Sequence, residues 1–292
     1  MTAIDANGIH IEYESLGDPG APAIVLIMGL GMQLIAWPDE FCRLLVGHGF
    51  RVIRFDNRDA GLSTRIPWAK RPRLMLAMIA ARLRLPVRSP YSLDDMAADT
   101  LGLLDALGIV RAHVVGASMG GMIAQQLAAR HPERVSHLIL FGGYDAGWRH
   151  GASAEEIRER EAIRVLTEAG WGSDDPAYRH LFSHTFMPTA SEAELAWFDE
   201  FQRRTTSPRN AVRFLDAFAS IDVRHRLAEL RVPTLILHSR GDQRIPCATG
   251  RRMAATIPGA EFVSLESSNH LLLGRESASR ALLEAVQEFL AR

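Results

Sequence analysis

The sequence has few cysteines, no long apolar run and almost no net charge. Its two cysteines, Cys42 and Cys247, lie far apart without metal-ligand spacing, so they suggest neither a disulfide framework nor a metal site. The longest apolar run, 23–32, is shorter than the roughly 20 residues that span a bilayer. A formal net charge of −1 creates no overall field for nucleic acid or an anionic membrane. The N-terminal segment, with Asp5, lacks the basic start of a signal peptide, which predicts a cytoplasmic protein.

Apolar segments of the length of β-strands recur along the chain. They are mostly unbroken and rich in β-branched residues, as expected of parallel strands covered on both faces. An alternating segment at 9–13 follows Asn7-Gly8, a dipeptide suited to a tight turn, and predicts an N-terminal hairpin. The other predicted strands are 23–28, 51–55, 112–116, 137–141, 233–239 and 260–265.

Helical periodicity separates these strands. It is clearest after Ser92, which forms a capping-box pattern with Asp95, and it ends at Gly108, a residue suited to a left-handed stop. Alternating strands and helices predict an α/β fold, with helices on both faces of a mostly parallel sheet. The chain of 292 residues, 47% hydrophobic and 23% charged, fits one main globular domain with an insertion.

Two segments depart from this alternation. Residues 144–226 carry helical patterns without a convincing strand and predict a helical cap, which leaves 1–143 and 227–292 as the core. Residues 65–92 hold seven basic residues and no acidic one around an apolar stretch. This segment fits a second lid element, whose apolar face covers the active site while its arginines stay in contact with water. It also fits an amphipathic helix that binds an anionic membrane or a partner. We favour the lid.

A serine between glycines follows the strand predicted at 112–116. The order Gly116-Ala117-Ser118-Met119-Gly120 matches G-x-S-x-G, and a helical pattern begins directly after it. At such a turn the strained serine points its hydroxyl out of the sheet, and glycines remove the Cβ atoms that would collide. The helix start adds N–H groups and a positive dipole beside the oxygen. Ser118 is therefore the candidate nucleophile.

A serine nucleophile needs a base, and the base needs an orienting acid. Asp242 and His270 each follow a predicted strand, at the edge where open α/β sheets place their functional groups. No histidine other than His270 follows Asp242. Asp145 is an alternative acid, although Asp242 is favoured. His180 and His184 have metal-like spacing but no further ligand set beside them, so no metal or other cofactor is expected.

These segments together resemble the α/β-hydrolase superfamily over essentially the whole chain. The segment "DNRDAGLS" at 56–63 is similar to the family's D-x-R-G-x-G-x-S loop, with Asp59 in place of a glycine. The chain looks most like bacterial esterases of the aclacinomycin methylesterase branch, in which Met-Gly, here Met28-Gly29, replaces His-Gly. The resemblance implies an eight-stranded sheet and an oxyanion hole from the backbone N–H groups of Leu30 and Met119.

The predicted function is a cofactor-independent serine esterase, a carboxylesterase whose small-molecule substrates are small to medium apolar esters. The predicted cap is rich in aromatic residues, which offer apolar surface to line the substrate pocket. The same triad could serve a lactonase, a thioesterase or another triad hydrolase. A ligand receptor or partner-binding protein on this fold is the non-enzyme alternative. No nucleic-acid partner is expected, membrane contact through 65–92 stays open, and the sequence leaves the oligomeric state undetermined.

Overall fold

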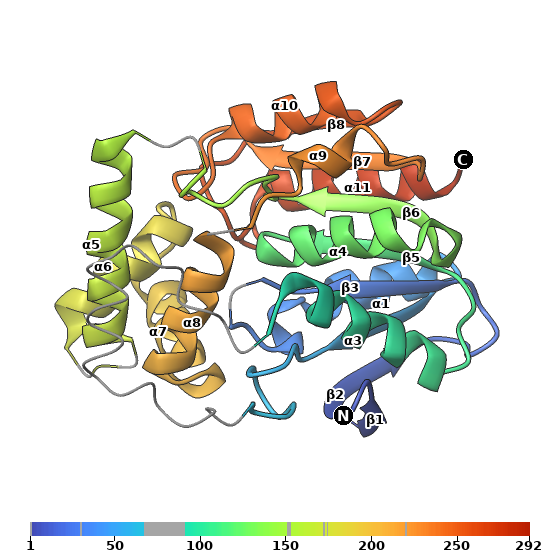
Figure 1. Cartoon of the computed structure of the whole chain (residues 1–292), viewed down its shortest axis with the longest axis horizontal. Helices are drawn as coiled ribbons and strands as arrows, with labels where there is room; N and C mark the ends of the chain where they lie inside the picture. Colours follow the sequence, from blue (N-terminus) through green and yellow to red (C-terminus); the bar gives the residue numbers. More distant parts are fainter. Residues whose placement is uncertain are drawn as a thin grey trace.

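The predicted strands assemble into one eight-stranded sheet with the order β1-β2-β4-β3-β5-β6-β7-β8 (Figure 1). The computed structural model describes residues 2–29, 31–66, 91–150, 153–171, 173, 175–219 and 221–292. The strands are β1 (Thr2–Ala6), β2 (Ile9–Leu16), β3 (Ala23–Ile27), β4 (Arg51–Phe55), β5 (Ala112–Ala117), β6 (Val135–Phe141), β7 (Thr234–Ser239) and β8 (Glu261–Leu265). β1 and β2 pair antiparallel, β2 joins β4 antiparallel, and the strands from β4 to β8 are parallel. The prediction of a mostly parallel sheet is confirmed.

Both faces of the central strands are buried, as their unbroken apolar sequences require. The helices around the sheet are α1 (Asp39–Gly47), α3 (Leu93–Ala106), α4 (Met119–Arg130), α9 (Arg224–Leu227), α10 (Cys247–Thr256) and α11 (Ser277–Leu290). In β3, Val25 and Ile27 belong to a core cluster that includes residues of α3 and α4. The alternate residues Ile24 and Leu26 belong to a second cluster with residues of α1 and α11.

The boundaries of α3 follow from local chemistry. The Ser92 hydroxyl accepts a hydrogen bond from the Asp95 N–H, and the Asp95 carboxylate accepts one from the Ser92 N–H, which completes the predicted capping box. Beyond the helix, Gly108 has a φ of +68°. Only glycine adopts this left-handed conformation readily, so the predicted stop is confirmed.

Four further helices gather beyond the carboxyl ends of the parallel strands (Figure 1). They are α5 (Ala154–Gly170), α6 (Pro176–Phe186), α7 (Glu192–Thr205) and α8 (Pro208–Ala219). They lie within the predicted cap, 144–226, whose exact limits stay a prediction. Most of the basic segment 65–92 lies outside the described residues. None of the helices in the described ranges combines the length and hydropathy that a membrane span requires.

The backbones of β3, β5 and α4 approach one another closely. A Cβ atom on Gly120 would lie 2.1 Å from the Ile27 carbonyl oxygen, and one on Gly116 would lie 2.5 Å from the Gly120 carbonyl oxygen. These contacts involve backbone atoms, which cannot move aside as a side chain can. Glycine at both positions lets the first turn of α4 sit directly against the two strands, as the G-x-S-x-G pattern predicts.

We expect Gly120→Ala to lower the free energy of unfolding by about 3 kcal/mol, because the new methyl group would force the backbones apart. Gly47→Ala is the matched control: Gly47 ends helix α1, and a Cβ there would meet nothing within 4 Å. The control should change stability by less than about 1 kcal/mol. Urea denaturation of the two variants measures both values, and equal stabilities would contradict the close approach of β3 and α4.

Candidate active site

Ser118 occupies the turn between β5 and α4 in a strained backbone conformation. Its φ is 53° and its ψ is −121°, values that few residues with a side chain adopt. Two hydrogen bonds hold this turn: the Ser118 N–H donates to the Phe141 carbonyl at 2.8 Å, and the Gly121 N–H donates to the Ser118 carbonyl at 3.0 Å. The side chain is half-buried. The turn therefore presents a hydroxyl at the carboxyl end of the sheet, beside the start of a helix.

Asp242 and His270 form a buried hydrogen-bonded pair at the same edge. His270 Nδ1 lies 2.7 Å from Asp242 Oδ2, and the two residues are 2% and 8% exposed. The other carboxylate oxygen, Oδ1, accepts the backbone N–H groups of Arg244 and Ile245 at 2.8 and 3.0 Å. A carboxylate that accepts from Nδ1 fixes the ring so that Nε2 points away from it.

The pair meets the Ser118 turn through the end of β6. The carbonyl of Phe141, the last residue of β6, accepts the Ser118 N–H. The next residue, Gly142, packs against His270. A Cβ on Gly142 would lie 3.3 Å from His270 Cε1 and 3.8 Å from Asp242 Oδ2. The structure thus brings the three predicted triad residues to one short segment of backbone.

A second histidine, which the sequence reasoning missed, contacts the same carboxylate. His238 is fully buried in β7, and its Nε2 lies 2.9 Å from the Ile245 carbonyl and 3.5 Å from Asp242 Oδ2. Since a carbonyl oxygen can only accept, Nε2 carries the hydrogen. Burial alone would raise the pKa of Asp242, but hydrogen bonds from His238 and His270 hold that pKa well below its usual range. Asp242 is therefore an anion at neutral pH.

The loop after β3 packs against the Ser118 turn. A Cβ on Gly29 would lie 3.0 Å from the Ser118 Cβ and 3.4 Å from the Met119 nitrogen. The Asn57 side-chain amide donates to the Met28 carbonyl at 2.9 Å. Because Asn57 follows β4, this hydrogen bond connects the loop after β3 to the end of β4. Of the two predicted oxyanion donors, Met119 is the first residue of α4, whereas Leu30 lies outside the described residues.

The 56–63 segment supports the same loop. Asp56 accepts the Leu34 N–H at 2.6 Å and the Leu62 N–H at 2.9 Å, and burial raises its pKa to about 6. Asp59, which stands where the similar family motif has glycine, adopts a positive φ of 64°. This is the conformation that glycine would provide at lower cost.

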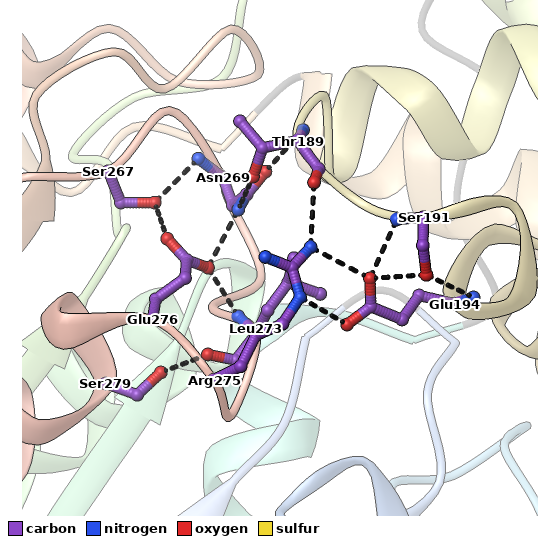
Figure 2. Close-up of polar contacts among 9 residues, drawn as sticks. All are labelled: Thr189, Ser191, Glu194, Ser267, Asn269, Leu273, Arg275, Glu276 and Ser279. Carbon is purple, nitrogen blue, oxygen red and sulfur yellow. Dashed lines mark hydrogen bonds and ion pairs between the residues drawn. The ribbon is translucent and has the colours of Figure 1, made fainter.

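A polar network holds the segment that carries His270 (Figure 2). Glu276 accepts from the Asn269 amide at 2.7 Å, from the Leu273 N–H at 2.6 Å and from the Ser267 hydroxyl at 2.5 Å. The Asn269 amide also donates to the Thr189 hydroxyl at 2.6 Å. Asn269, directly before the histidine, is fully buried. The Glu276 carboxylate thus closes the 267–276 loop on itself, and the Asn269 side chain links this loop to Thr189.

The helices of the predicted cap contact this loop directly. The His270 N–H donates to the Phe186 carbonyl at 2.8 Å, and the Phe186 ring meets the His270 ring edge-on with centres 5.6 Å apart. Arg275 donates to the Thr189 carbonyl at 2.9 Å and pairs with Glu194 of α7 (Figure 2). The end of α6 and the segment after it therefore help to fix the orientation of His270.

The other sequence candidates lie elsewhere in the structure. Asp145, the alternative acid, is 2.8 Å from Arg252, whereas His270 bonds to Asp242. In the residues that the structure describes, no group of three or more His, Cys, Asp or Glu side chains could hold a metal ion. Cys42 and Cys247 are both free.

Comparison with known proteins assigns the family. The sequence profile of the alpha/beta hydrolase fold matches residues 22–276. The chain belongs to the α/β-hydrolase family. Rhodomycin D methylesterase DnrP of Streptomyces peucetius is 30% identical over 90% of each chain. The putative carbamate hydrolase RutD of Caulobacter segnis is 27% identical over 92% of each. Among solved structures, an enol-lactonase from Burkholderia xenovorans is 26% identical, with a TM-score of 0.76 over the whole of both chains.

These matches confirm the resemblance that the motifs predicted. They also show that the fold drawn in Figure 1 is the α/β-hydrolase fold. Three residues around the candidate triad of this hydrolase were not found from the sequence. They are Gly142, His238 and Glu276. Each contributes a packing or hydrogen-bond contact that no motif encodes.

We expect Glu276→Gln to lower kcat about tenfold and the free energy of unfolding by about 1–3 kcal/mol. The amide accepts fewer hydrogen bonds than the carboxylate, so a buried donor of the 267–276 loop loses its acceptor. Steady-state kinetics and urea denaturation measure the two effects.

Glu266→Gln is the matched control, because Glu266 lies just before the same loop and pairs with Arg240 on the surface. This variant should lose less than about 1 kcal/mol. If Glu276→Gln kept full kcat, the network would have no part in orienting His270.

Proposed function

We propose that this hydrolase is a serine esterase that cleaves carboxylic esters through an acyl-enzyme intermediate. The observation that carries the proposal is the buried His270 Nδ1–Asp242 Oδ2 hydrogen bond of 2.7 Å beside the strained Ser118 turn. The kinship with proteins named as methylesterase and hydrolase supports ester hydrolysis as the reaction class.

In the proposed reaction, Ser118 Oγ attacks the ester carbonyl carbon while His270 Nε2 takes the serine proton. The tetrahedral intermediate collapses, the bond to the alkoxy oxygen breaks, and His270 returns the proton to the leaving alcohol. Water then attacks the acyl-enzyme with the same base, which releases the acid and restores Ser118. Asp242, ionised throughout, holds the imidazole in place and stabilises its charged form.

The negative oxygen of the intermediate needs donors that are already in position. The Met119 N–H at the start of α4 suits this role, since helix starts leave N–H groups without an intrahelical acceptor. The contact of Gly29 with Ser118 and Met119 brings the loop after β3 to the same point. We assign the second donor to Leu30, as the family resemblance implies.

The surroundings of His270 favour a substrate with apolar parts. Phe186, which contacts the histidine, belongs to a cluster of buried apolar side chains that joins the cap helices to the loop after β3. Its members include Met28, Met32, Trp171, Phe182, Phe198 and Phe201. A lactone is a cyclic ester that the same steps would open, and the likeness to an enol-lactonase makes lactones the second substrate class to test.

We expect hydrolysis of 4-nitrophenyl esters from acetate to decanoate to peak at one acyl length, because the apolar side chains beside His270 can cover only a limited length of chain. Ser118→Ala should lower kcat/KM at the optimum by at least about 10³-fold, the scale on which loss of a catalytic nucleophile acts. A fluorophosphonate should label the wild-type protein on Ser118. An unlabelled, inactive wild-type protein would favour the receptor alternative.

We expect kcat/KM to fall tenfold for each pH unit on the acid side of the profile. The reason is that the proposed mechanism needs one neutral base, which a single proton inactivates, whereas Asp242, with its pKa held well below the usual range, stays ionised. A slope of one therefore reports a single titrating group. A slope of two would show that Asp242 titrates in the same range. Samples returned to neutral pH and assayed again distinguish titration from acid unfolding.

A further inference from the structure

Two arginines contact each other beside the candidate triad. Arg244 stands two residues after Asp242, and Arg160 of α5 reaches across to donate to the Arg244 carbonyl at 3.4 Å. Within the described ranges, neither guanidinium forms an ion pair with an Asp or Glu side chain. Asp242 is close enough to attract Arg244, but both its oxygens already accept other hydrogen bonds.

Two aromatic rings lie against the Arg244 guanidinium. Its central carbon lies 4.4 Å from the ring centre of Phe186 and 5.4 Å from that of Phe182. A phenyl ring provides no oxygen or nitrogen acceptor, so these two contacts leave the guanidinium N–H groups able to form hydrogen bonds. A single side-chain acceptor, the Thr185 hydroxyl, lies at 3.4 Å among the described residues. Most of the five donors of Arg244 therefore remain for a ligand.

Phe186 connects this guanidinium to the catalytic centre. The same ring that lies under Arg244 contacts the His270 ring at 5.6 Å. Tyr144, two residues after Gly142, lies close enough to Arg244 for their charges to interact, and Gly142 itself packs against His270. An ionic group bound by Arg244 would thus lie one aromatic ring away from the reacting atoms.

The two positive charges are unfavourable for each other. Burial and the neighbouring charge of Arg160 lower the pKa of Arg244 to about 10, so it stays protonated at neutral pH. Burial also raises the pKa of Tyr144, which keeps its hydroxyl neutral and able to donate. Repulsion between two partly buried cations is relieved when an anion binds between them.

We propose that Arg244 and Arg160 form a carboxylate-binding subsite, so that this hydrolase prefers esters or lactones that carry a second, free carboxylate. The inference rests on the proposed esterase function and names its substrate class. Guanidinium edges match the two oxygens of a carboxylate, and the apolar surroundings strengthen the pairing.

The test compares two matched pairs of substrates, each with a neutral and an acidic member. Methyl hexanoate and monomethyl adipate differ by a carboxylate on the acyl side. 4-Methylphenyl acetate and 4-acetoxybenzoate differ by one on the leaving group. The readout is the ratio of kcat/KM for the acidic member to that for the neutral member. Taking the ratio cancels any general loss of activity in a variant.

In the pair whose carboxylate reaches the subsite, we expect Arg244→Gln to lower this ratio about tenfold to a hundredfold, the usual effect of one charge-assisted hydrogen bond. Arg160→Gln should lower it less, and Arg244→Lys should restore part of it. Arg240→Gln is the matched control, since Arg240 is on the same loop but is exposed and paired with Glu266. It should leave the ratio unchanged.

Unchanged ratios in both pairs for Arg244→Gln and Arg160→Gln would overturn the subsite and leave the arginines a role in docking the cap. If Arg244→Gln does not fold, Arg160→Gln gives the same decision, because it lies on a different element. Wild-type hydrolysis of the neutral esters, abolished by Ser118→Ala, tests the esterase function separately. The subsite can therefore fail while the proposed function stands.

Discussion

The close approach of backbones around Ser118 is the constraint on which the rest of the site depends. Gly116 and Gly120 allow α4 to start directly on β5 and β3, at distances that a single methyl group would violate. This contact makes the reversal from strand to helix sharp enough to hold Ser118 at a φ of 53°. Once the hydroxyl is fixed there, the base has to come from loops at the same edge of the sheet.

The candidate base, His270, is fixed from two directions. From the core, Asp242 binds the ring of His270 and is itself held by two backbone N–H groups and by His238. From the cap side, the carbonyl and ring of Phe186 contact the backbone and ring of the same histidine. The position of the helix that ends at Phe186 is therefore coupled to the orientation of His270. If the proposed function holds, a substrate that shifts this helix would also affect the candidate base.

Much of the fold could be predicted from the sequence, for reasons that lie in local chemistry. The strands of the parallel sheet are buried on both faces, so their unbroken apolar segments identified them, and capping residues located helix α3. Ser118, Asp242 and His270 each follow a strand, and the topology of a parallel sheet brings such positions together. Asp242 rather than Asp145 bonds to His270, in agreement with the order of preference reached from the sequence.

The contacts around the triad could not be predicted, since they join residues far apart in the chain. Phe186 and His270 are separated by more than 80 positions, and nothing near either residue encodes their hydrogen bond. The hydrogen bond from the Arg160 side chain to the Arg244 carbonyl likewise depends on how α5 packs, which no local pattern specifies. Leu30 and most of the 65–92 segment lie outside the described residues, and their roles stay predictions.

The central claim is that Ser118, His270 and Asp242 act as one unit. The most direct measurement is kcat/KM for Ser118→Ala, His270→Ala and the double variant, with urea denaturation to show that each is folded. Residues that act as a unit are not additive, so the double variant should be no slower than Ser118→Ala alone. If the two losses multiplied in the double variant, Ser118 and His270 would act independently, and the account of the site would be wrong.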